Sequence, residues 1–140
     1  MRKYAAVGLA ICLASCAPAM TPRVEPVTYV GNSSEILATI VRVAPTLQLS
    51  KYYEPFAVVS ATPNAVTLSA KPTMGNRLLV GFLAGVSSSD MLVTFTALPT
   101  GDRTIVTYNV SGNLRSSNSD ALPIAKTIYS ELDKHFQRVQ

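Results

Sequence analysis

Histidine and long apolar stretches are scarce in this chain of 140 residues. His135 is the only histidine, which excludes a metal site built from several histidines and leaves one residue for any Ser-His-Asp triad. No G-x-S-x-G motif is present to supply the serine of such a triad. After the first 16 residues, the longest apolar run is residues 78–86, about half the length of a membrane-spanning helix. The sequence therefore predicts neither a histidine metal centre nor a transmembrane helix.

Charged residues are also few, at 14% of the chain, and they are scattered. Without Arg2 and Lys3 at the N-terminus, ten of the 12 basic residues remain against eight acidic ones, a net charge of +2. Nucleic-acid binding needs a concentrated positive surface. No basic cluster or basic stripe with interleaved aromatic residues is present, so no nucleic-acid partner is expected.

The acidic residues do not suggest a catalytic pair. Most of them occupy predicted helix starts, turns or a helix surface, and only Glu54 has no evident structural role. Beside Lys51, Tyr52 and Tyr53 it can line a groove, although a loop leading into a strand with amphipathic tyrosines is the favoured interpretation. We therefore expect no catalytic residues, no metal and no cofactor. An envelope hydrolase would have to use His135 or Glu54.

The N-terminal segment has the layout of a secretory signal peptide. Arg2 and Lys3 form a positive region, residues 5–13 are mostly apolar, and small residues follow. This order of a charged region, a short apolar region and a small-residue cleavage site is typical of exported proteins.

The four residues Leu13-Ala14-Ser15-Cys16 resemble the lipobox of bacterial lipoproteins. The resemblance implies that Cys16 becomes the first mature residue and receives lipid, including an acyl chain such as palmitate, as its membrane anchor. Two or more acyl chains give stable anchoring. Ala17 follows instead of an aspartate, which favours the periplasmic face of the outer membrane in a cell with two membranes. With Cys12 removed and Cys16 modified, no intramolecular disulfide is possible.

The chain divides into three parts: a signal peptide at residues 1–15, a proline-rich tether at residues 16–30, and one small domain at residues 31–140. Pro18, Pro22 and Pro26 favour an extended conformation for the tether.

Two helices are predicted at the ends of the domain. Asn32 and Glu35 are typical of a helix start, apolar residues recur at helical spacing, and Pro45 ends the pattern, which predicts a helix at residues 33–44. A second helix is predicted from Asp120 as its cap, with Pro123 in its first turn, to about residue 137. Its apolar face is Leu122, Ala125, Ile128, Tyr129, Leu132, Phe136 and Val139.

Between these helices the apolar period changes to two. Strands are predicted at residues 56–62, 66–71, 77–86, 91–97 and 103–110, with short turns between them. The expected fold class is α+β, with an antiparallel meander of four or five strands. The N-terminal and C-terminal helices pack on one face of this sheet.

The leading functional hypothesis is a non-enzymatic, lipid-anchored accessory or binding module for other cell-envelope components, with an envelope protein as partner. Binding would use an exposed sheet edge, or the loops around Tyr52-Tyr53 and residues 111–119. The alternative is a carrier that holds an apolar or lipid ligand between the sheet and the second helix, because Gly81 and Gly85 fall on one side of a predicted strand. Those two glycines are also typical of close helix–sheet packing.

Overall fold

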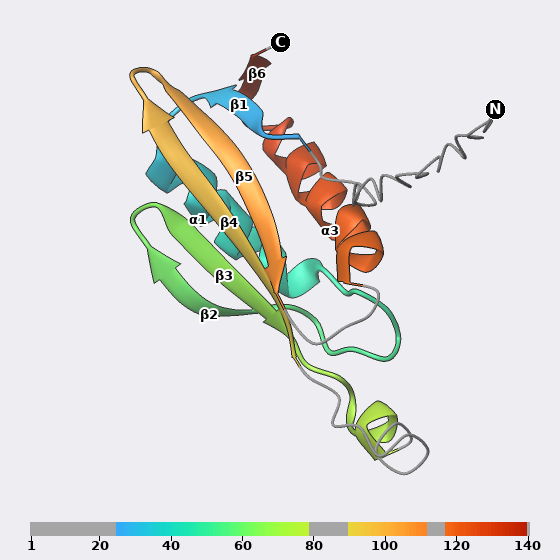
Figure 1. Ribbon diagram of the computed structural model, residues 1–140. Coiled ribbons are helices and arrows are strands. Elements are labelled where there is room, and N and C mark those ends of the chain that lie inside the picture. The colour runs from blue at the N-terminus through green and yellow to red at the C-terminus, as the bar shows by residue number, and fades with distance from the viewer. Residues whose placement is uncertain (1–24, 79–89, 112–116, 140) are drawn as a thin grey trace, which may run out of the picture.

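Six antiparallel strands form one open sheet in the computed structural model, which describes residues 25–78, 90–111 and 117–139 (Figure 1). The strands lie in the order β2-β3-β4-β5-β1-β6. In chain order the elements are β1 (Val27–Val30), α1 (Ser33–Val43), the 3-10 helix η1 (Ala44–Thr46), β2 (Ala57–Thr62), β3 (Ala65–Ala70), β4 (Met91–Thr100), β5 (Arg103–Ser111), α3 (Ser117–Leu132) and β6 (Gln137–Val139).

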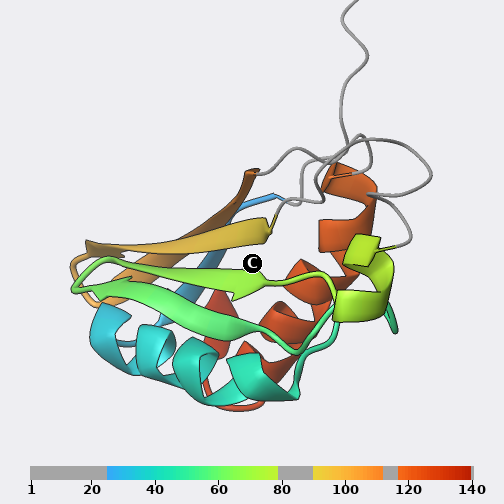
Figure 2. The same ribbon diagram turned by 90° about the horizontal axis from the view of Figure 1, so that it is seen from below.

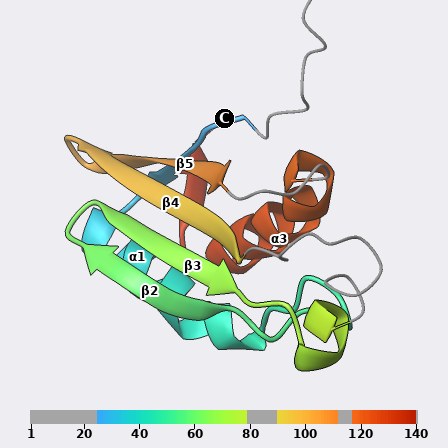
Figure 3. The same ribbon diagram turned by 60° about the horizontal axis from the view of Figure 1, so that its bottom comes forward.

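The helices α1 and α3 cover the same face of the sheet (Figures 2 and 3). This arrangement confirms the predicted α+β architecture, with both helices on one side. The helix α1 starts as predicted, because the Asn32 side chain accepts a hydrogen bond from the Ser34 amide at 2.9 Å. Its apolar stripe places Ile36, Leu37 and Ile40 in the core.

Strand β4 shows how the alternating pattern divides the two faces. Its fully buried side chains contribute to the core under the helices: Met91, Val93, Phe95 and Ala97. The residues between them, Leu92, Thr94 and Thr96, are partly exposed on the opposite face. Successive side chains of a strand point to opposite faces, so one face of the sheet is apolar and the other is mixed.

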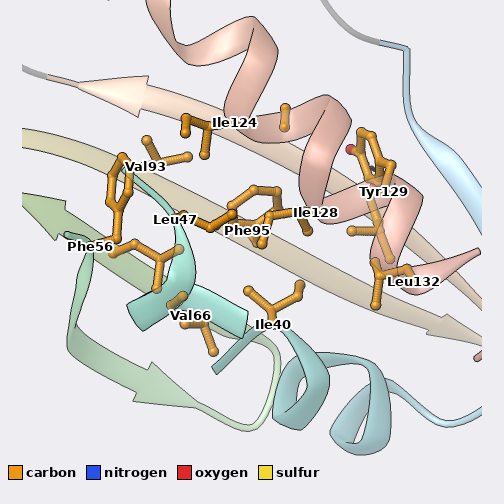
Figure 4. Packing of buried hydrophobic residues seen from close by; sticks show 14 of the residues in the cluster. Ile40, Leu47, Phe56, Val66, Val93, Phe95, Ile124, Ile128, Tyr129 and Leu132 are labelled. Atoms are coloured by element: carbon orange, nitrogen blue, oxygen red, sulfur yellow. Dashed lines mark hydrogen bonds between the residues drawn. The ribbon is translucent and has the colours of Figure 1, made fainter. Parts of the chain in front are cut away.

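The core lies between this apolar face and the two helices (Figure 4). Phe95 sits among side chains from several elements, including Ile40 of α1 and Ile128 of α3. The helix α3 also contributes Ile124, Ala125 and Leu132, all nearly or completely buried. Both cysteines precede residue 25, so apolar packing has to stabilise this domain without a disulfide.

Two strands were not expected from the sequence. Strand β1 (Val27–Val30) lies within the predicted tether, and its pairing with β5 makes these residues part of the sheet. Strand β6 begins at Gln137, where the last helix is predicted to end, and pairs with β1. The strand predicted at residues 77–86 is wrong at its start, because residues 74–78 are helical, and its remainder lies outside the described residues.

The last helix differs from the prediction at both ends. It begins at Ser117, so Pro123 lies in its second turn, and residues 117–119 belong to a helix instead of the predicted loop. It ends at Leu132 instead of residue 137, since the amides of His135 and Phe136 both bond to the Leu132 carbonyl at 3.0 and 2.8 Å and turn the chain back. Phe136 then packs edge-on against Tyr29, with ring centroids 6.4 Å apart. Phe136 therefore fits the helical spacing of apolar residues, although it lies in the turn after the helix.

Replacing Phe95 with alanine tests the importance of this core. Phe95→Ala is expected to lower the free energy of unfolding by about 3–5 kcal/mol, because Phe95 is fully buried and its removal leaves a cavity. Urea unfolding followed by far-UV circular dichroism measures the change. The matched control is Leu98→Ala on the same strand, where the side chain is 48% exposed and the expected change is within about 0.5 kcal/mol. Equal effects of the two substitutions would contradict this account of the core.

Candidate functional site

The predicted site residues Tyr52, Tyr53 and Glu54 lie in a loop that crosses the end of β3. The Glu54 amide bonds to the Lys71 carbonyl at 2.8 Å, and the Thr73 amide bonds to the Tyr52 carbonyl at 2.9 Å. Tyr53 packs against the core, whereas Tyr52 is 53% exposed. Glu54 is exposed. The loop thus places Tyr53 against the core and leaves Tyr52 and Glu54 exposed.

The remaining predicted site residues, Cys16, Gly81 and Gly85, lie outside the described residues. The carrier hypothesis places a ligand between the sheet and the second helix. In the described part of this interface, Val93, Phe95, Ile124 and Ile128 fill the space and are almost completely buried (Figure 4). No observation on the described residues favours a ligand there.

His135 lies exposed in the turn after α3, consistent with a solvent-facing side chain. Within the described ranges, no group of three or more His, Cys, Asp and Glu side chains is placed to hold a metal ion. Over the same ranges, no helix combines the length and the apolar character needed to cross a membrane.

Strand β2 forms one edge of the sheet and is the most distinctive surface of the described domain. Among the described residues it pairs only with β3. All six of its residues, Ala-Val-Val-Ser-Ala-Thr, are exposed, and none is charged. Val58 is 37% and Val59 is 55% exposed, and the pairing register shifts between Val58 and Ser60. The main-chain groups on the outer side of β2 are therefore available to another strand.

The opposite edge of the sheet is different. Strand β6 has only three residues, and its central residue is charged. The Arg138 Nε donates to the Asp133 carboxylate at 3.1 Å, which holds the cation beside the strand. Short length and a charge are common protections of an edge strand. Among the described residues, one edge is therefore protected by a charge and the other, β2, is not. We call β2 the unprotected edge, because only its register shift opposes further pairing.

The open face of the sheet carries mainly threonine and aliphatic side chains. Thr67 and Thr94 share a hydrogen bond of 3.0 Å across β3 and β4. Leu98, Ile105 and Thr28 follow one another across β4, β5 and β1 in the pairing register. Apart from Arg103 at the start of β5, the described residues of β3, β4 and β5 on this face are uncharged, and the face continues from the unprotected β2 edge.

A polar cluster below the β1–β6 edge was not predicted from the sequence. The Tyr29 hydroxyl donates to the Asp133 carboxylate at 2.9 Å and lies 3.3 Å from the Tyr129 carbonyl. Tyr29 is fully buried, and burial raises its pKa to about 12, with Arg138 lowering it and Asp133 raising it. Burial also raises the pKa of Tyr129, whose hydroxyl donates to the Val106 carbonyl at 3.3 Å. The only sequence signal for this cluster is the β-branched and aromatic composition of residues 27–30, which is typical of a strand.

A groove of about 630 Å³ lies next to this cluster, between α3 and the β1–β6 edge. Its lining includes both signs of charge, with Glu25 and Asp133 against Lys126 and Arg138. Since the charges are mixed and Arg138 is paired with Asp133, the groove has no evident preference for an anion or a cation. We interpret the Tyr29 cluster as a structural connection between α3 and the sheet.

Comparisons of the chain with protein families, with curated proteins and with solved structures find no match. The functional argument therefore depends on the surfaces described above.

The Tyr29 cluster predicts a loss of stability at alkaline pH. A phenol in the unfolded chain has a pKa of about 10. Because the folded pKa of Tyr29 is higher, near 12, its contribution to stability is complete below pH 10 and disappears as the pH rises to about 12. Tyr29→Phe is expected to make the decline in unfolding free energy over this range shallower, with Tyr129 still contributing. Urea unfolding at several pH values measures the slope, and an unchanged slope would contradict the assignment.

Proposed function

We propose that this protein is a non-enzymatic, lipid-anchored component of the bacterial cell envelope that binds another envelope protein by strand addition. The observation that carries the binding proposal is the unprotected β2 edge, six exposed and uncharged residues with pairing on one side only among the described residues. The lipobox-like residues Leu13-Ala14-Ser15-Cys16 support the anchor.

Strand addition suits this edge for a physical reason. In this mode, main-chain hydrogen bonds provide affinity and alternate side chains provide specificity. A partner strand beside β2 would satisfy its outer amide and carbonyl groups. It would also cover apolar surface at Val58 and Val59, which are 37% and 55% exposed. With no charge on β2, the expected partner segment is an extended one rich in β-branched or small residues.

The irregular register of β2 is compatible with a single, specific partner. The shift between Val58 and Ser60 leaves Val59 without a partner in β3. Such bulges bend the strand and make uncontrolled pairing less favourable. A partner that matches this bend gains the full set of main-chain bonds, whereas a flat strand does not.

The proposed location is the periplasmic face of the outer membrane in a cell with two membranes. The lipid on Cys16 would anchor the chain there, and the segment before β1 would connect the anchor to the domain. An exported domain without a disulfide has to be stable through packing alone, which agrees with the continuous core between the sheet and α1 and α3.

The anchor is tested by replacing Cys16. Cys16→Ser is expected to abolish incorporation of a clickable fatty acid in growing cells, because serine has no thiol to receive the lipid. The variant should also leave the membrane fraction or accumulate as an uncleaved precursor. The matched control is Cys12→Ser, which should be labelled like the wild type. An unlabelled wild-type protein would contradict the proposed anchor.

The binding edge is tested by adding one charge to it. Val59→Lys should weaken partner binding by about tenfold or more, since a lysine on an edge strand opposes further pairing. Native mass spectrometry of the lipoprotein, gently extracted from its own membrane, measures the fraction that carries a second protein chain.

The control for this substitution is Leu98→Lys. Leu98 is 48% exposed on β4, away from the edge, so this variant should retain the partner. Loss of the partner in Leu98→Lys alone would assign binding to the open face instead. The edge assignment would fail if Val59→Lys bound the partner as well as the wild type does. A wild-type protein with no second chain would contradict the binding module itself.

A further inference from the structure

Exposed apolar side chains gather at one end of the domain, where β3 ends and β4 begins. Met74 is 79% and Leu78 is 69% exposed, and these are the two most exposed large apolar side chains of the described residues. They are four residues apart in the helical segment 74–78, so they share one side of it. Figure 1 shows this segment in light green beyond the end of the sheet.

Tyr52 belongs to the same end of the molecule. The Thr73 amide bonds to the Tyr52 carbonyl at 2.9 Å, which fixes the loop beside the start of the helical segment. The Tyr52 ring is 53% exposed, and the Lys51 Nζ lies 5.1 Å from its centroid. We call Tyr52, Met74 and Leu78 the apolar tip.

Basic residues are close in the chain to the residues of the apolar tip. Lys51 and Lys71 are exposed, and no ion pair is found for either among the described residues. Arg77 lies 3.7 Å from the Asp90 carboxylate in an exposed pair. A second acidic residue, the exposed Glu54, follows Tyr52 and Tyr53 in their loop. Exposed apolar and tyrosine side chains beside lysines are typical of a surface that enters the headgroup region of an anionic membrane.

The segment before the domain is long enough to let the domain reorient above the membrane. Glu25 comes nine positions after Cys16 in the chain, which corresponds to an extended length of about 30 Å. Glu25 lies beside Leu122 and Lys126 of α3, within about 14 Å of the start of that helix along its axis. Figure 1 shows α3 beginning at the end of the sheet that carries the apolar tip.

We infer that the apolar tip, flanked by Lys51 and Lys71, inserts into the headgroup region of an anionic phospholipid membrane. This inference builds on the proposed lipid anchor, which keeps the domain close to that membrane. Two contacts, the anchor and the tip, would then fix the orientation of the domain on the lipid surface.

The chain has no tryptophan, so a single introduced tryptophan reports on the contact. The test uses the full lipoprotein with Met74→Trp, reconstituted in vesicles of phosphatidylcholine and phosphatidylglycerol with and without brominated acyl chains. Bromine should quench the tryptophan of Met74→Trp at least threefold more strongly than that of the control Leu98→Trp, whose site is at the other end of β4. Adding Lys71→Glu to Met74→Trp should reduce the quenching, as should high salt.

The outcomes separate the two proposals. Equal quenching of the two tryptophans would overturn the membrane contact of the tip. A blue-shifted Met74→Trp spectrum without vesicles would also overturn it, because protein would then already bury the side chain at position 74. The intact mass of the same sample reports the acyl groups on Cys16 independently, so a failed anchor is distinguished from a failed tip contact.

Discussion

The fold depends on the packing of one apolar sheet face against two helices. No disulfide can contribute to the described domain, because both cysteines precede residue 25. Phe95, at the centre of the core, contacts groups from both helical and strand elements, so its removal would affect the whole domain. Apolar burial is the dominant favourable term in folding. The Tyr29 hydroxyl adds a directional element by bonding to Asp133 after α3, which fixes the end of that helix relative to β1.

Because the helices cover one face of the sheet, the other face and the two edge strands, β2 and β6, remain exposed to other molecules. The β6 edge is short and carries Arg138 in an ion pair with Asp133, so the cluster that fixes α3 also protects this edge. The β2 edge has no comparable protection apart from its irregular register. In a stable monomer an exposed, uncharged edge is a liability. The partner strand that we propose would cover this edge, which is why we base the proposed function on β2.

The sequence predicted those elements whose patterns are local. The Asn32 cap and the apolar spacing defined α1, and the alternation in residues 91–97 and 103–110 defined β4 and β5. Strands β1 and β6 were missed because each is short and is stabilised only by pairing with distant residues. Phe136 fitted the helical spacing and was therefore assigned to the helix, but it lies in the following turn and packs against Tyr29. The sequence suggested that a sheet edge binds a partner. It could not identify β2 as an edge strand, because strand order is a property of the whole fold.

The two proposed contacts are geometrically compatible. Ala57 pairs with Ser69 near the end of the sheet that carries the apolar tip, and Thr62 pairs with Ala65 at the other end. With the tip on the lipid surface, β2 therefore runs away from the membrane, and its outer edge faces sideways along its whole length. A partner strand could approach without displacing lipid. A domain held only by its tether would present this edge in all orientations, whereas a domain held at two points presents it in one. Fixing the orientation lowers the entropic cost of binding, so the membrane contact would strengthen partner binding without touching the partner.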